Sequence, residues 1–202
     1  MISCDLREIP SASDRKPQST RMLGSTLRCF RTTATRTHAS GPARFVHTEE
    51  RLRSLGIVLP SPGQPKANYN IICWESPTLL YMSGHVPARG DGSMITGTVG
   101  PGGLSLDEGK EAARWCGLNL IATMKDQLGD LDRVEKVVKL FGIVSSKPAF
   151  KEQHLVMNGA SDVMMHVFKD RGYHARSAIG TNTLPLGIAV EVEAIVKVKA
   201  AV

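Results

Sequence analysis

The segment from Ile188 to Lys199 constrains the fold most, because its residues alternate with a period of two. Successive side chains of a β-strand point to opposite faces of the sheet. One face of this segment is wholly aliphatic, whereas the other carries Glu191 and Glu193 near its centre and two lysines toward its end. The pattern predicts a strand whose aliphatic face lies under helices. That face consists of Ile188, Val190, Val192, Ala194, Val196 and Val198.

Two segments predict the helices that cover this face. The first runs from Ser105 to Leu128, where Ser105 and Glu108 have the spacing of a capping box and Gly129 follows the last turn. Its apolar residues recur at helical spacing and form one side. The second helix is predicted from about residue 151 or 153 to residue 169.

The remaining regular segments predict strands that pair into one sheet. A short helix is expected at 49–55, and together the elements alternate between strands and two long helices. We therefore predict the α+β class, with a mixed β-sheet that carries two helices on one face. The expected strands are 68–75, 79–83, a short one at 94–97, 133–145, 176–180 and 188–199.

Basic residues are concentrated in the N-terminal part of the chain. Residues 1–47 hold eight Lys/Arg and three Asp/Glu, whereas the remaining residues hold 17 and 16. From Lys16 to His47 the chain has no acidic residue and is rich in Arg, Ser and Thr, a composition typical of mitochondrial presequences. We predict a presequence or a disordered tail at 1–45 and a folded domain at 46–202. If the segment is a presequence, we expect the protein in the mitochondrial matrix. If it is a tail without a targeting signal, we expect the protein in the cytoplasm.

The charge and cysteine patterns argue against several classes of protein. A nearly neutral domain lacks the basic face that binds phosphates, which argues against nucleic-acid binding. No Cys-x-x-Cys pair is present, so we expect no metal site. No apolar run approaches the length of about 20 residues that a membrane helix needs, so we expect no membrane partner.

Several short motifs lie along the sequence: Tyr69, Leu80-Tyr-Met-Ser83-Gly84-His85-Val-Pro87, Asn158, Arg176 and Glu191-Val-Glu193-Ala. In their order and spacing they resemble the reactive intermediate deaminase family, also called the YjgF or L-PSP endoribonuclease family. The resemblance covers about residues 65–200, and Arg176 and Glu191 are 15 residues apart, as in that family.

The resemblance implies a chorismate-mutase-like fold that assembles as a homotrimer, with pockets between subunits. It also implies hydrolysis of reactive enamines and imines of amino-acid metabolism to 2-keto acids and ammonia. Neither a metal nor an organic cofactor is expected. The implied partners are small 2-imino or 2-keto acids and further copies of the same chain.

Arg176 and Glu191 are the catalytic residues that the resemblance implies. An arginine can hold the carboxylate of an imino acid by two parallel N–H···O bonds. A carboxylate can position or deprotonate the attacking water. The resemblance points to Glu191 for this role, but strand alternation does not separate Glu191 from Glu193.

Four further residues are expected to bind substrate. Tyr69 can close the pocket, although it also fits a half-buried strand aromatic. Ser83 and Gly84 can present a hydroxyl and a backbone N–H, although both also fit turn chemistry. Asn158 is predicted inside a helix, where an asparagine needs a polar contact with a ligand or within the helix packing. His85 is expected to be structural.

Two other functions fit the same residues. The family name also carries an endoribonuclease or translation-inhibitor activity. A non-catalytic trimer could instead use Arg176 to bind a small keto acid without turnover.

Overall fold

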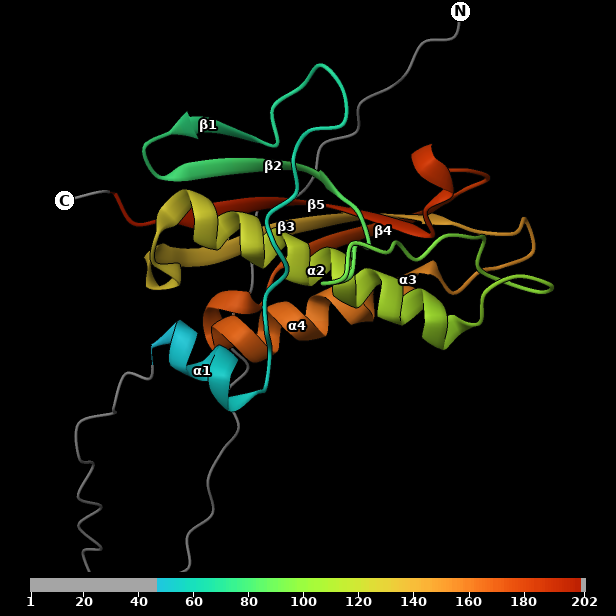
Figure 1. Ribbon diagram of the computed structural model, residues 1–202, viewed down its shortest axis with the longest axis horizontal. Helices are drawn as coiled ribbons and strands as arrows, with labels where there is room; N and C mark the ends of the chain where they lie inside the picture. The colour runs from blue at the N-terminus through green and yellow to red at the C-terminus, as the bar shows by residue number, and fades with distance from the viewer. Residues whose placement is uncertain (1–46, 201–202) are drawn as a thin grey trace, which may run out of the picture. The chain divides into compact units, whose positions relative to one another are not determined.

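A computed structural model describes residues 47–200 of the chain. The predicted presequence lies outside the described residues. The described part contains one five-stranded sheet with α-helices gathered on one side of it (Figure 1). Within it, no helix is both long enough and apolar enough to cross a bilayer.

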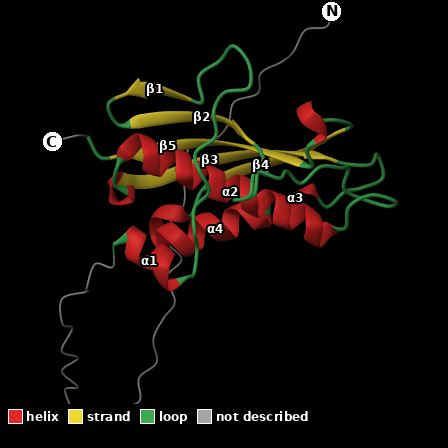
Figure 2. Cartoon of the chain, in the orientation of Figure 1, coloured by secondary structure: helices red, strands yellow, loops and turns green. Residues whose placement is uncertain are grey.

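The sheet is mixed, as predicted. β3 and β4 pair in parallel, and all the other pairs are antiparallel. Figure 2 shows the strands as one layer beside the helices. Across the sheet the strands follow the order β1 (Ile72–Ser76), β2 (Leu79–His85), β5 (Val190–Val198), β3 (Val134–Ser145) and β4 (Ala175–Thr181).

Four α-helices lie in the described part of the chain. The first predicted long helix is α2, whose capping box between Ser105 and Glu108 and closing Gly129 are both confirmed. The second is interrupted at Met157, where a tightened turn separates two shorter helices. The helices are α1 (Thr48–Ser54), α2 (Leu106–Leu128), α3 (Gln153–Val156) and α4 (Asn158–Phe168).

The core lies between the sheet and the helices. The aliphatic face of β5 is buried from end to end, as the alternation predicts, and packs against buried residues of α2 such as Cys116 and Leu120. The opposite face of the sheet carries the charged residues of β5 and is open along much of its length. Strict alternation would put Ala189 on that open face as well, but Ala189 is buried and lies in the connection before β5.

Some predicted boundaries were wrong. The expected strand at 94–97 forms only two isolated bridges, to Ala88 and Ile188, because a loop with left-handed Gly92 and Gly97 runs through this region. β1 begins at Ile72 and not at residue 68, so Tyr69 precedes the strand.

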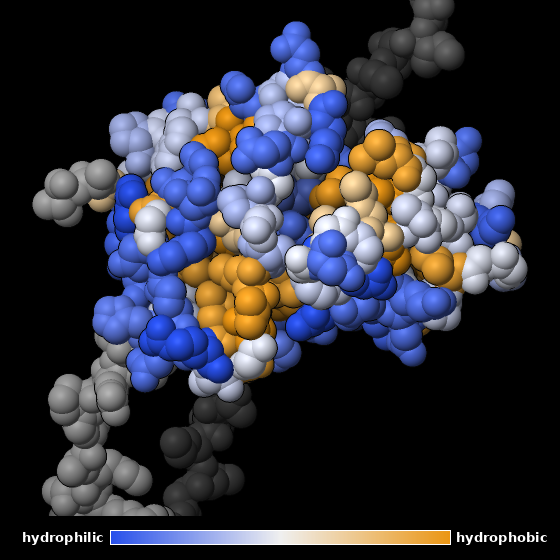
Figure 3. Space-filling model, in the orientation of Figure 1, coloured by the Kyte–Doolittle hydropathy of each residue, from blue (hydrophilic) through white to orange (hydrophobic). Residues whose placement is uncertain are grey.

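Segment 55–59 carries the exposed side chains Leu55 and Val58, and Figure 3 shows apolar surface on this helix side of the molecule.

Candidate functional site

Arg176 lies on β4 and points toward α3 and α4. Its Nη1 donates to Asn158 Oδ1 at 3.1 Å and to Ser161 Oγ at 2.8 Å, and its Nη2 donates to the His154 carbonyl at 2.8 Å. Of its five N–H groups, one on Nε and one on Nη2 make no hydrogen bond in the described part of the chain. Partial burial lowers the pKa of Arg176, and Asp162 acts in the opposite sense.

A relay of hydrogen bonds holds the Arg176 side chain in this position. His174 Nδ1 bonds the Gly172 carbonyl at 2.6 Å, and because a carbonyl only accepts, the proton is on Nδ1. His174 Nε2 therefore accepts from Ser161 Oγ at 3.0 Å, and Ser161 in turn accepts from Arg176. Sequence reasoning missed Ser161, although it follows Asn158 by three residues and so shares its side of a helix.

Asn158 is the first residue of α4, not a residue inside a longer helix as predicted. Its amide oxygen accepts from Arg176, which is the polar contact that the sequence led us to expect. The interruption at Met157 thus places Asn158 where its side chain reaches β4.

Glu191 lies against Gly84, across an irregularity in the pairing of β2 with β5. The register shifts between Met82 and His85, so β2 bulges where it faces Glu191. A Cβ atom at position 84 would overlap the Glu191 carboxylate, so glycine is required for this approach. Burial raises the pKa of Glu191, and the neighbouring charge of Glu193 raises it further. The strand expected at 79–83 ends before Gly84, but β2 runs to His85 and contains both Ser83 and Gly84.

His85 is structural, as expected. Its Nδ1 bonds the Ser83 carbonyl at 2.7 Å and its Nε2 bonds Thr123 Oγ1 at 2.9 Å, so α2 and the bulge are tied together. Burial lowers the pKa of His85 to about 4, and the bond to Ser83 opposes this effect. The ring is therefore neutral near pH 7 and has no nitrogen left for a substrate.

Tyr69 and Gly84 line the same hollow of about 210 Å³, which we call the Tyr69 hollow. Tyr69 is 43% exposed, and its hydroxyl accepts a long hydrogen bond of 3.4 Å from the Lys66 backbone N–H. Ser83 lies beside Gly84, and its hydroxyl donates to the Asn70 carbonyl at 2.7 Å. The segment before β1 and the bulge of β2 thus form one part of the candidate site.

The predicted residues form two groups that do not meet within one chain. Arg176 pairs with Leu140 of β3, and Leu140 pairs with Ala194 of β5. Leu140 and Ala194 are buried under the helices, so Arg176 lies on the helix-covered face of the sheet. Glu191 pairs with Ile143, which is three residues from Leu140 along β3. Side chains an odd number of residues apart on a strand point to opposite faces, so Glu191 lies on the other face of the sheet. β3 also separates their two strands.

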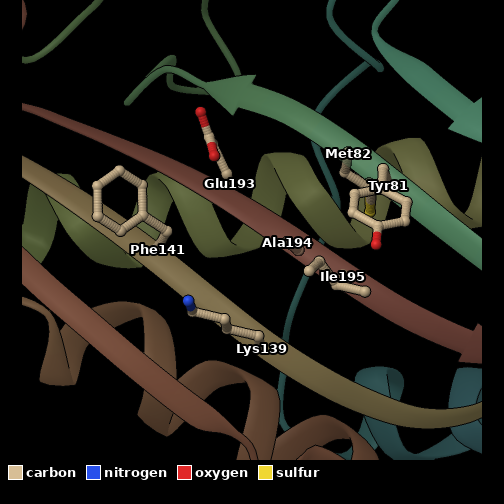
Figure 4. A pocket seen from close by; sticks show the side chains of 7 residues that line it. All are labelled: Tyr81, Met82, Lys139, Phe141, Glu193, Ala194 and Ile195. Carbon is tan, nitrogen blue, oxygen red and sulfur yellow. The ribbon is translucent and has the colours of Figure 1, made fainter.

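A second depression, of about 340 Å³, lies on the open face of the sheet (Figure 4). Figure 4 shows Tyr81 from β2, Glu193 and Ile195 from β5, and Lys139 and Phe141 from β3 on its lining. Glu193 is exposed here, whereas Glu191 is half-buried at the bulge. The structure thus separates the two glutamates, which strand alternation alone did not.

One group of carboxylates could in principle hold a cation. Glu49, Asp130 and Asp132 lie close together, yet protein donors already occupy them. Glu49 accepts from Lys125 Nζ at 2.6 Å and from the Leu131 N–H, and Asp130 caps a short 3₁₀ turn. Asp132 accepts from the backbone N–H and the hydroxyl of Thr48 and from Arg171, so we assign no metal to this group.

Comparison with known proteins supports a family assignment. Protein TCP17 of Trypanosoma cruzi is 46% identical over 148 residues, which are 72% of this chain and 91% of that protein. The crystal structure of protein Atu1372 from Agrobacterium tumefaciens is 38% identical, with a TM-score of 0.68 over 75% of this chain and 94% of the other. A Shewanella oneidensis structure is 27% identical, with a TM-score of 0.72 over 75% and 99%.

The fold defines a small α+β protein in which a mixed sheet packs under helices. The model of the family described as "YjgF/chorismate mutase-like, putative endoribonuclease" matches residues 49–196. The chain belongs to this family, as the sequence motifs predicted.

Proposed function

We propose that this protein hydrolyses 2-imino acids to 2-keto acids and ammonia, at a site shared between two copies of a homotrimer. The observation that carries the proposal is the fixed guanidinium of Arg176, which retains N–H groups on two adjacent nitrogens. A fork of this kind binds a carboxylate by two hydrogen bonds. The relay through Ser161 and His174 fixes the fork before substrate binds.

In the proposed reaction, Arg176 holds the substrate carboxylate and thereby fixes the adjacent C=N carbon. Glu191 takes a proton from a water molecule, whose oxygen bonds to that carbon while the π electrons of the C=N bond move to nitrogen. Glu191 passes this proton to nitrogen, which gives a carbinolamine. The remaining hydroxyl proton then moves through Glu191 to nitrogen, the C–N bond breaks, and ammonia leaves as the C=O bond forms. A carboxyl group whose pKa is raised by burial suits both proton transfers near neutral pH.

The need for a second copy follows from distances. The carboxylate of a 2-imino acid is bonded directly to the reacting carbon, so anchor and base must approach the same few atoms, to about 3–3.5 Å. Arg176 and Glu191 of one chain are on opposite faces, with β3 between their strands, and each step between strands is about 4.8 Å. We propose that Arg176 of one copy meets Glu191, Gly84 and Tyr69 of its neighbour.

The proposal is tested by trapping the imine. An amino-acid oxidase supplies the imine, and semicarbazide captures it as a chromophore in competition with hydrolysis. We expect wild-type protein to reduce semicarbazone formation, Arg176→Ala to abolish this effect, and Arg176→Lys to recover little of it, because lysine lacks the fork. Wild-type protein that leaves semicarbazone formation unchanged would refute the function.

Binding of RNA is not favoured by the charges. Outside residues 1–47 the chain holds 17 basic and 16 acidic residues, so the domain lacks the excess of positive charge that drives phosphate contact.

A further inference from the structure

Asn119 of α2 has a polar atom that the fold does not use. It is 4% exposed, and its amide nitrogen donates to three backbone carbonyls: Ala88 at 2.8 Å, Trp115 at 2.8 Å and Val86 at 3.3 Å. These carbonyls fix which end of the amide is nitrogen, because only the –NH₂ group can donate to them. The amide oxygen, Oδ1, makes no hydrogen bond in the described part of the chain.

Asn119 lies in the wall of the Tyr69 hollow. Every fully buried side-chain nitrogen or oxygen among the described residues has a hydrogen-bond partner, so Oδ1 of Asn119 must retain some accessible surface. Asn119 lines the hollow together with Tyr69 and Gly84. Oδ1 can therefore accept from water or from a ligand in the hollow. A ligand that displaces the water without offering a donor leaves this acceptor unpaired, which is costly.

The size of the hollow indicates what part of a ligand it takes. Sites for whole drug-sized ligands usually measure about 300–1,000 Å³. The Tyr69 hollow, at about 210 Å³, is smaller than that and much larger than a site for one water molecule. Its volume suits a side chain of a few atoms. Gly84 both lines the hollow and lies against Glu191, so the hollow adjoins the proposed reaction centre.

The charges of the lining restrict the chemistry of that side chain. Among the residues that line the hollow, Lys66 alone is charged near neutral pH, and it is exposed. Both ring nitrogens of His85 are already bonded. A cationic side chain would meet Lys66 without a carboxylate to offset it, and a carboxylate would place an acceptor against Asn119 Oδ1. An uncharged side chain with an O–H or N–H group can donate to Asn119 Oδ1 and adds no charge next to Lys66.

We propose that the Tyr69 hollow is the substrate side-chain subsite, and that Asn119 makes it selective for uncharged side chains ending in a hydroxyl or amide donor. The inference rests on the proposed function for the position of the substrate, with its carboxylate on Arg176 of the neighbouring copy. Selectivity comes from the acceptor that an apolar side chain would leave unpaired.

The test measures binding, so it does not depend on turnover. Dissociation constants of the full chain are measured for 4-hydroxy-2-oxobutanoate and 2-oxopentanoate, which differ by a terminal hydroxyl in place of a methyl, and for pyruvate. We expect the hydroxy acid to bind roughly threefold to tenfold more tightly than 2-oxopentanoate, the range that one hydrogen bond gives. Equal binding of the two acids would overturn the proposal.

Two variants separate the subsite from the fold. Asn119→Leu should bring the ratio of the two constants to about one. Because this change also removes bonds to Val86 and Ala88, Ala88→Leu is the second variant: it adds bulk to the lining and keeps the Asn119 side chain. It should weaken both longer acids and leave pyruvate unchanged, and Ala67→Leu, outside the hollow, should change nothing. Wild-type binding of the longer acids by Ala88→Leu would overturn the subsite.

The proposed function and the subsite can fail separately. If semicarbazide trapping shows no hydrolysis but the hydroxy acid still binds more tightly, the subsite stands and the deaminase activity falls. If hydrolysis is found but both acids bind equally, the function stands and the subsite falls.

Discussion

The substitution Gly84→Ala displaces Glu191 without touching Arg176. The added Cβ would overlap the Glu191 carboxylate and lie 2.8 Å from its Cγ, where ordinary contact begins at 3.4 Å. Glu191 Oε1 is the atom nearest to the added Cβ, so the carboxylate has to retreat by more than ~1 Å. A misplacement of about 1 Å in a catalytic group already costs on the order of 100-fold in rate. We expect kcat to fall about 100-fold.

The same substitution should affect the fold far less than the rate. The displaced atoms belong to the end of a flexible, half-buried side chain, so the change in free energy of unfolding should remain near the 1 kcal/mol typical of point mutations. Imine hydrolysis is measured by semicarbazide competition and stability by urea denaturation. Gly90→Ala is the control, because a Cβ there meets nothing within 4 Å. A Gly84→Ala protein with wild-type kcat would refute the role of Glu191 at the bulge.

Three other predictions follow from the same residues and from the N-terminal segment. Glu193→Gln removes a charge that raises the pKa of Glu191, so the acid limb of the kcat/KM profile should move to lower pH. The shift should be partial, because burial still raises this pKa. An acid limb that does not move would contradict the effect of Glu193 on Glu191. The pKa of His85 is lowered to about 4, so its neutral form stabilises the fold fully above about pH 6.5. This contribution to the free energy of unfolding, up to about 3 kcal/mol, is lost as the pH falls toward 4. Urea denaturation at pH 7.5 and 4.5 should show a smaller acid loss in His85→Gln, and an equal loss would exclude His85 as its source. A fluorescent protein fused after residues 1–45 should enter mitochondria. Fluorescence spread through the cytoplasm would instead favour a disordered tail without a targeting signal.

Periodicity and capping predicted the sheet and the main helix because these depend on local chemistry. The alternation of β5 and the capping box of α2 are both present as expected. The break at Met157 was not predictable from the helical pattern, because backbone hydrogen bonds from Met157 to Gln153 and from Ser161 to Met157 continue across it. Met157 packs against Gly142 of β3, a tertiary contact that the helical pattern does not reveal.

The site was predicted as a set of residues but not as a geometry. The motifs identified Arg176 and Glu191, and the strand pairing then showed that they face opposite sides of one sheet. Ser161 and Asn119 carry no motif of their own. Their roles depend on partners far away in the sequence, such as His174 and the carbonyl of Ala88, and so appear only in three dimensions.

Complementation between two inactive variants tests the shared site most directly. Arg176→Ala and Glu191→Gln are produced separately and together, with different tags so that mixed assemblies can be isolated. If each site takes Arg176 from one copy and Glu191 from its neighbour, about one quarter of the sites in an equal mixture contain both native residues. A shared site predicts that each variant alone is inactive and that the isolated mixed trimers, each with one native site in three, recover about one third of wild-type hydrolysis. Mixed assemblies that remain as inactive as either variant would contradict it.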